Sequence, residues 1–163
     1  MVDVAGRDGG RRGRARGARP RHLDVPLEPR PPPGAEWTFF DEKSAPADVL
    51  VGLSEGEVAG YLKLGPATPL GASAHILMIN GFAVGPAMQG RGVGRALIGA
   101  AIAEARRRGA RRLRLRVLGL NARARRLYES AGFVVDGVLP GEFFLDGVYV
   151  DDVFMGLDLA APD

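Results

Sequence analysis

A glycine-rich run between two apolar segments limits most strongly what this chain can fold into. The run reads Gln89-Gly-Arg-Gly-Val-Gly-Arg95; it follows an apolar stretch that ends at Val84 and precedes apolar residues at helical spacing. Glycines let the backbone come close to a ligand, and the N–H groups at the start of a helix attract anions. The run therefore predicts a strand, a loop suited to a pyrophosphate and a helix, in that order.

This loop matches neither of two common nucleotide-binding motifs. No Gly-Lys-Ser/Thr follows it, as a P-loop requires, and Arg95 stands where the dinucleotide motif G-x-G-x-x-G has its third glycine. Taken alone, the loop is also compatible with a tight turn that binds no ligand. A second motif is needed to choose between these two interpretations.

Hydrophobic periodicity divides the rest of the chain into short strands and two helices. Residues 112–118 alternate between arginine and apolar residues, which predicts a strand with one charged face. Asn80-Gly81 interrupts an apolar run and favours a bulge or splay within a strand, and Asn121 is a suitable helix N-cap. Glu55-Gly56 and Asp146-Gly147 are expected hairpin turns. The expected strands span residues 49–54, 57–64, 74–84, 112–118, 133–139, 142–145 and 148–159, and the expected helices span residues 91–108 and 122–131.

This order of elements predicts one α/β domain with a mixed sheet layered by helices. The chain has 163 residues, of which 46% are hydrophobic, as suits a single globular domain. We expect that domain over residues 35–163. Residues 1–34 are rich in Arg, Gly and Pro and show no periodic apolar pattern, so we expect a disordered tail there. An inert extension or an early start codon is favoured over a nucleic-acid-binding arm, because no aromatic residues are interleaved to stack on bases.

The second motif lies one expected strand after the glycine loop. It reads Asn121-Ala-Arg-Ala-Arg-Arg-Leu-Tyr-Glu-Ser-Ala-Gly-Phe133. Together, V-x-P followed by Q-G-x-G-x-G, and N-x-x-A-x-x-x-Y-x-x-x-G-F, resemble the acyl-CoA-binding core of the GNAT-type N-acetyltransferases. The resemblance runs from about Val49 to Leu159. It implies a GNAT-like mixed, mostly antiparallel sheet flanked by helices, with a splayed strand pair that forms the acyl-CoA slot.

The resemblance implies acetyl-CoA as the co-substrate and no metal. The strand that ends at Val84 would offer backbone groups to the pantetheine arm, and the loop N–H groups would hold the pyrophosphate. Residues 91–126 contain twelve arginines against one acid, which fits an anionic ligand. By the resemblance, the cofactor-binding residues are Phe82, Ala83, Val84, Gln89, Gly90, Arg91, Gly92, Val93, Gly94, Arg95, Asn121, Ala124 and Tyr128.

The implied reaction moves an acetyl group to a primary amine of a small molecule, an amino acid, or a peptide N-terminus or lysine. Tyr128 would donate a proton to the departing thiolate, and a backbone N–H near Ala83 or Val84 would polarise the thioester carbonyl. The chain has no cysteine, which supports direct transfer without a covalent enzyme intermediate. The alternative for Tyr128 is a helix tyrosine that packs its ring on the core with its hydroxyl in water.

The sequence does not fix a general base. Many family members carry Glu or Asp on the strand before the loop, whereas residues 74–84 hold no carboxylate, and Asn80 can only position a water. His75 has a suitable intrinsic pKa, although a lone histidine on an apolar strand is more often packed or at an edge. Four acids near the C-terminus could attract an ammonium group or accept its proton, namely Glu142, Asp146, Asp151 and Asp152, with Asp146 better explained as a turn residue.

Two other functions remain open, and the amine acceptor is unknown. The chain could be a non-catalytic acyl-CoA-binding module of GNAT fold, or a nucleic-acid-associated protein that uses its Arg-rich segments. Family members usually begin with a strand and helices that line the acceptor pocket, and no helix is expected before Val49. Trp37, Phe39 and Phe40 could form a pocket wall there, or a partner chain could complete it, so a homodimer is expected. No apolar run is long enough to span a membrane, so the expected location is cytoplasmic.

Overall fold

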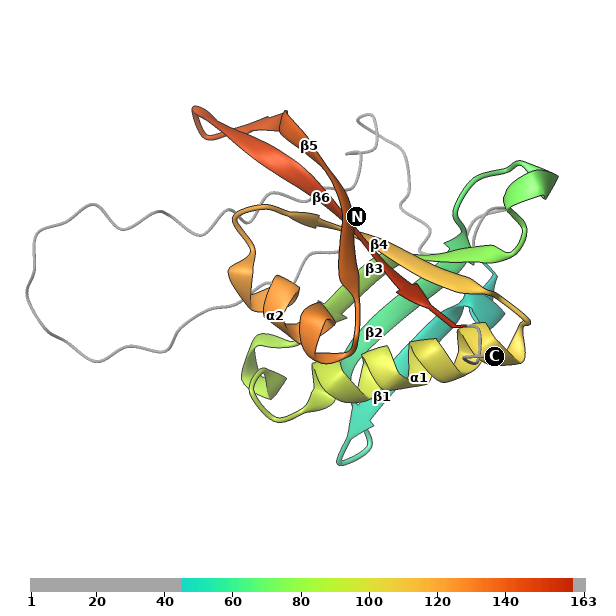
Figure 1. Ribbon diagram of the computed structural model, residues 1–163. Helices are drawn as coiled ribbons and strands as arrows, with labels where there is room; N and C mark the ends of the chain where they lie inside the picture. Colours follow the sequence, from blue (N-terminus) through green and yellow to red (C-terminus); the bar gives the residue numbers. More distant parts are fainter. Residues whose placement is uncertain (1–44, 160–163) are drawn as a thin grey trace, which may run out of the picture.

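The computed structural model describes residues 45–159, which form a six-stranded sheet and two α-helices (Figure 1). The predicted tail, together with Trp37, Phe39 and Phe40, lies outside these residues. Short 3-10 turns occur at Pro46–Asp48, Gly71–Ser73 and Pro86–Met88. In chain order, the main elements are β1 (Val49–Ser54), β2 (Glu57–Pro66), β3 (Ile76–Val84), α1 (Val93–Arg107), β4 (Arg112–Leu118), α2 (Ala122–Ser130), β5 (Val134–Leu145) and β6 (Val148–Asp158).

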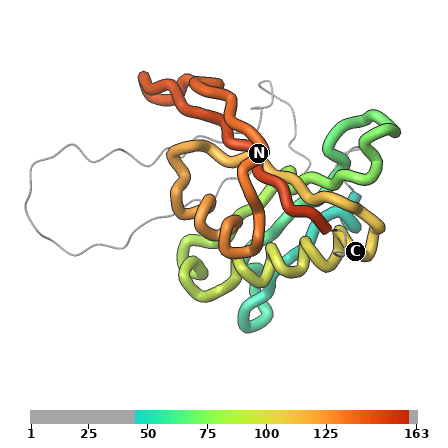
Figure 2. The backbone as a smooth tube through the Cα atoms, in the orientation of Figure 1, coloured from blue at the N-terminus to red at the C-terminus, as the bar shows by residue number. Residues whose placement is uncertain are grey.

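The strands lie in the order β1-β2-β3-β4-β6-β5, and only the β3–β4 pair is parallel. The predicted mixed, mostly antiparallel sheet is therefore confirmed. Both predicted hairpin turns are also present. Glu55 and Gly56 have φ values of 54° and 85°, and Asp146 and Gly147 have 47° and 82°, as a two-residue hairpin turn with two left-handed residues requires. The β5–β6 hairpin extends away from the rest of the sheet (Figure 2).

The β3 strand contains a bulge at the predicted position. Lys63 of β2 pairs with Gly81 and the next residue, Leu64, pairs with Ile79, so Asn80 has no partner on β2. An extra residue bends its strand and increases the local twist. On the other side, β3 pairs with β4 only from Ile76 to Ile79. The parallel pair therefore opens at the bulge, which is the splay that the sequence predicts.

Several predicted boundaries differ from the structure by one or two residues, and the clearest differences are these. The helix predicted from residue 91 begins at Val93, because Gly92 has a φ of 85° and cannot continue a right-handed helix. The strand predicted from residue 74 begins at Ile76, after the Gly71–Ser73 turn. The two strands predicted at 133–139 and 142–145 form the single strand β5, because β5 keeps its pairing with β6 across two register shifts.

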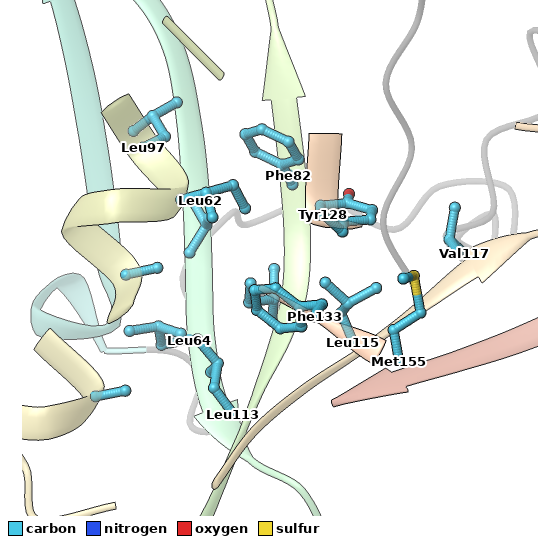
Figure 3. Packing of buried hydrophobic residues seen from close by; sticks show 14 of the residues in the cluster. Leu62, Leu64, Phe82, Leu97, Leu113, Leu115, Val117, Tyr128, Phe133 and Met155 are labelled. Carbon is cyan, nitrogen blue, oxygen red and sulfur yellow. The ribbon is translucent and has the colours of Figure 1, made fainter. Parts of the chain in front are cut away.

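Both helices cover one face of the sheet and share one hydrophobic core with it (Figure 3). The core side chains of β4 are Leu113, Leu115 and Val117, each with no exposed surface, so the arginines between them lie on the opposite face. Burying a side chain of this size stabilises the fold by about 1.5–3 kcal/mol. No helix within residues 45–159 has the length and apolar character needed to cross a membrane.

An ion-pair cluster fixes the C-terminal end of α1. The Glu104 carboxylate accepts hydrogen bonds of 2.7 Å from Arg107 and from Arg108, and Arg108 also donates to Asp48 in the first 3-10 turn. The hydrogen bonds from Arg107 and Arg108 lower the pKa of Glu104 from 4.5 to about 2. The cluster thus links the end of the helix to the start of the sheet.

Glu104→Gln should make the protein less sensitive to acid. A carboxyl whose pKa is lowered by folding stabilises the fold above its unfolded pKa of 4.5, and this contribution is lost as pH falls toward 2. Urea unfolding at neutral pH and at several acidic pH values should show a steeper loss of stability for the wild type than for the variant between these limits. Parallel pH dependences for the two proteins would contradict the prediction.

Candidate active site

The opening between β3 and β4 exposes one backbone edge of β3. Beyond Ile79 no ladder pairing joins β3 to β4 within the described residues. The side chains of Phe82 and Val84 point into the core, whereas Ala83 is half-buried on the other face. The N–H and C=O groups along this edge are therefore placed to pair with an extended ligand that lies in the opening, in the way that a further strand would.

The glycine loop leads from this strand directly into α1. Gly90 and Gly92 have φ values of 78° and 85°, and a Cβ atom added to either would meet no atom within 4 Å. The first bond of the helix runs from the Ala96 N–H to the Gly92 carbonyl at 3.0 Å. The N–H groups before Ala96 therefore have no partner inside the helix, and α1 has neither a side-chain cap nor an acid in its first turn.

These features fit a pyrophosphate. Open space, unpaired helix N–H groups and the positive end of the helix dipole together favour an anion. Arg91 and Arg95 are exposed on either side of the start of α1. Gly94 has a different role, which is to allow close packing. A Cβ atom added there would lie 3.2 Å from Leu127 and 3.4 Å from the Phe82 ring. Gly94 therefore lets the first turn of α1 approach α2 and β3 closely.

The second motif places a tyrosine inside the same region. Asn121 caps α2, since its Oδ1 accepts a 3.0 Å hydrogen bond from the Ala124 N–H. Ala124 and Tyr128 lie on the buried face of the helix with no exposed surface. The Tyr128 ring packs between Phe82 and Phe133, with ring centroids 6.3 Å and 6.0 Å away (Figure 3). Tyr128 thus lies beside the part of β3 that follows the bulge.

A polar contact joins the two motifs. Arg123 of α2 donates from Nη1 to the Gln89 Oε1 at 2.8 Å, and the Gln89 Nε2 donates to the Val84 carbonyl at 3.3 Å. The contacts connect the end of β3, the loop and α2. All thirteen predicted cofactor-binding residues lie on these three segments and the start of α1. Sequence reasoning missed Arg123, and only its place two residues after the cap could have drawn attention to it.

Most candidates for the general base lie away from this opening. His75 is exposed at the closed end of the β3–β4 pair, where its carbonyl accepts from the Arg111 N–H, about 30 Å along the strand from Val84. The Asn80 amide lies over Gly65 of β2, since a Cβ at Gly65 would be 2.6 Å from it. Asp146 is in the β5–β6 turn, and Glu142 is exposed on β5.

The two remaining acids differ sharply in their surroundings. Asp151 is exposed and accepts a 2.9 Å hydrogen bond from the Gly141 N–H, which holds the β5–β6 hairpin in shape. Asp152 has no exposed surface and pairs through Oδ2 with Nε of Arg116 at 2.6 Å and with Nη2 of the same residue. The Arg116 guanidinium also lies 4.9 Å from the centroid of the Phe154 ring. Asp152 is therefore the predicted acid that the fold buries beside the β4 strand.

A pocket of about 270 Å³ lies between α2 and the β5–β6 hairpin. None of the predicted cofactor-binding residues lines it. Its walls are formed by Gly119, Leu120, Arg125, Val135, Val138, Tyr149, Val150, Asp151 and Val153. No group of three or more His, Cys, Asp or Glu residues among 45–159 is arranged to hold a metal ion.

Comparison with known proteins gives a consistent result. The sequence model of the acetyltransferase (GNAT) family matches residues 19–133. The chain belongs to the GNAT family. It is 36% identical over 118 residues to the L-methionine sulfoximine/L-methionine sulfone acetyltransferase of Salmonella typhimurium, which covers 71% of this chain and 68% of that relative. The family match begins inside the segment predicted to be a tail.

Solved structures of other GNAT proteins share the fold. A Salmonella typhimurium acetyltransferase solved with its cofactor acetyl-CoA has a TM-score of 0.65 and 36% identity, over 71% of this chain and 68% of that one. The ribosomal-protein-alanine N-acetyltransferase of Brucella melitensis has a TM-score of 0.63 and 33% identity, over 68% and 67%. This GNAT protein is accordingly an acetyl-CoA-dependent N-acetyltransferase, and the predicted family and enzyme class are confirmed.

Proposed function

We propose that this GNAT enzyme acetylates a primary amine by direct transfer from acetyl-CoA bound in the opening between β3 and β4. The observation that carries the proposal is the location of this opening. It lies beside an uncapped helix start rich in positive charge and beside the buried Tyr128. A pyrophosphate and an extended pantetheine arm need these two environments next to each other.

Different segments of the chain bind different parts of acetyl-CoA. The N–H groups from Gln89 to Gly94 hold the pyrophosphate, with charge added by Arg91 or Arg95. The β3 edge at Phe82, Ala83 and Val84 pairs with the pantetheine arm, and Asn121 and Ala124 line its path. The Arg123–Gln89 contact supports this assignment, because it ties the loop to α2.

Transfer of the acetyl group then requires only a backbone N–H and one side chain of this protein. Acetyl-CoA, when bound, supplies an activated acetyl thioester. A backbone N–H near Ala83 or Val84 polarises its carbonyl while the N–C bond forms and the C–S bond breaks. Tyr128 donates its proton to the departing sulfur, and the proton that the amine loses passes to solvent, from which Tyr128 is protonated again. Burial of Tyr128 beside the opened part of β3 supports this role over that of a surface tyrosine.

The acceptor is a small amine or the amino group of an amino acid or peptide. The similarity to the L-methionine sulfoximine/L-methionine sulfone acetyltransferase favours an amino-acid acceptor. The similarity to the ribosomal-protein-alanine N-acetyltransferase makes a protein N-terminus a second candidate. We retain the homodimer as part of the proposal, because the projecting hairpin exposes Phe144, Val148 and Tyr149.

Two measurements on the full chain test the proposal. Calorimetric titration should show saturable acetyl-CoA binding, and CoA release should be seen with at least one compound in a panel of amino acids, amino-acid amides and N-terminal peptides. Binding without turnover of any amine would favour the non-catalytic module. A folded protein that does not bind acetyl-CoA would contradict the proposal, and salt-sensitive binding to DNA or RNA would then support the nucleic-acid alternative.

A further inference from the structure

Arg125 and Asp151 both line the pocket of about 270 Å³ between α2 and the β5–β6 hairpin. The two side chains carry opposite charges, yet they form no ion pair with each other in the described part of the chain. Opposite charges at one cavity attract each other, so the fold holds these two groups apart. The space between them is open to a ligand that carries both charges.

The guanidinium of Arg125 has unused hydrogen-bonding capacity. Within residues 45–159 it makes no hydrogen bond, and its ion pair with Glu129 is 3.8 Å long, beyond hydrogen-bonding distance. Its side chain is 36% exposed, so the group can be reached from the pocket. Other arginines of the fold do donate hydrogen bonds to side chains, namely Arg107, Arg108, Arg112, Arg116 and Arg123.

The carboxylate of Asp151 is held in place and still has one oxygen available. Oδ1 accepts a 2.9 Å hydrogen bond from the Gly141 N–H, which fixes the orientation of the group. Oδ2 has no partner among the described residues, and the side chain is exposed. An ionised carboxylate oxygen in this position can accept a hydrogen bond from a cationic donor.

The rest of the pocket is mostly apolar and its volume is small. Val135 and Val138 keep 44% and 45% of their surface exposed there, and covering them with an apolar group would be favourable. Pockets for drug-sized ligands measure about 300–1,000 Å³. The volume of this pocket corresponds to about nine water molecules at about 30 Å³ each, which suits a compound of the size of an amino acid.

The pocket is separate from the opening between β3 and β4. Ala124 and Tyr128 lie on the buried face of α2, whereas Arg125 faces the pocket. No predicted cofactor-binding residue lines the pocket within the described chain. A ligand in this pocket would therefore have α2 between itself and the proposed path of the pantetheine arm.

We infer that this pocket binds a free α-amino acid with an apolar side chain, as the zwitterion. Arg125 donates to the α-carboxylate, a group whose two oxygens match the planar guanidinium. The Asp151 Oδ2 accepts from the ammonium group, and the apolar side chain covers Val135 and Val138. The inference does not depend on the proposed acetyl transfer, because it concerns a different site.

Calorimetric titration of L-leucine into the full chain, without acetyl-CoA, should show saturable binding. Two matched compounds each lack one charge, since L-leucinol has no carboxylate and 4-methylpentanoate has no ammonium group. Each should bind about 10- to 100-fold more weakly than L-leucine, because one charge-assisted hydrogen bond is lost. If neither L-leucine nor L-methionine binds at about 10 mM, the inference is overturned.

Variants of the two charged residues test where the amino acid binds. Arg125→Gln and Asp151→Asn should each weaken L-leucine binding by about 10- to 100-fold. The matched control is Arg126→Gln, which changes the next arginine of α2, an exposed residue that does not line the pocket, and should leave the Kd within about twofold. Unchanged affinity in both pocket variants would refute the inference.

Backbone amide resonances of the wild type provide a test that needs no variant. L-leucine should shift the resonances of Gly119, Leu120 and Val138. Shifts confined to Phe82 and Ala83 would place the amino acid in the acetyl-CoA slot, which would overturn this inference and leave the proposed function standing. Pocket resonances that move on dilution of the protein, and not with L-leucine, would assign the pocket to a second copy of the chain and would also overturn it.

Discussion

Gly92→Glu is expected to weaken acetyl-CoA binding by about 100-fold or more, the largest single effect that the structure predicts for affinity. The new carboxylate would lie at the start of α1, where a pyrophosphate is proposed to sit. Two like charges about 4 Å apart repel by several kcal/mol near a protein surface. Calorimetric titration of acetyl-CoA into the wild type and the variant would measure the loss.

Gly92→Gln separates charge from backbone strain in this test. Gly92 has a φ of 85°, so either side chain strains the loop by about 1–2 kcal/mol, and a Cβ meets no atom within 4 Å. The glutamine variant should therefore lose much less affinity than the glutamate variant, and the difference should shrink as salt is added. Equal losses in the two variants, or no loss in either, would contradict a phosphate site at this helix start.

Tyr128→Phe should lower kcat by about 100-fold with little change in the acetyl-CoA Kd, as expected when a general acid is removed and binding is not. The phenyl ring keeps the packing between Phe82 and Phe133, so the thermal midpoint should change little. Steady-state kinetics and calorimetric titration of the wild type and the variant would measure kcat and the acetyl-CoA Kd.

Tyr149→Phe is the matched control for the loss of a tyrosine hydroxyl. Tyr149 is 73% exposed on the projecting hairpin, where its ring packs on Phe144. This variant should retain the wild-type kcat. If Tyr128→Phe also keeps its kcat within about threefold, Tyr128 is a packing residue, and the proton for the leaving thiolate comes from solvent or from another group.

Much of the fold was predictable because its signals are local. The alternation over β4 predicted both a buried face and an arginine face, and Asn121 predicted the cap of α2. The Asn80-Gly81 interruption predicted the bulge at which β3 and β4 separate. Each of these features depends on residues within a few positions of one another, and short-range periodicity and backbone preferences describe such features well.

The parts that could not be predicted depend on contacts between residues far apart in the chain. Arg123 and Gln89 meet only because the sheet brings α2 beside the loop. Asp152 was one of four candidate acids in the sequence, and only the register of β6 against β4 shows that it is buried against Arg116. The union of the two closing strands into β5 likewise depends on bulges that β6 accommodates and that no local pattern marks.

The bulge in β3 has a consequence for how such a binding slot can arise by descent. Leu77 and Ile79 face the core before Asn80, and Phe82 and Val84 face it afterwards. On a strand without Asn80 the same four side chains would alternate regularly, since the side-chain period of a strand is two residues. The core therefore does not require the extra residue. Insertion of one residue is compatible with the parting of β3 from β4, because every buried side chain of β3 keeps its place in the core.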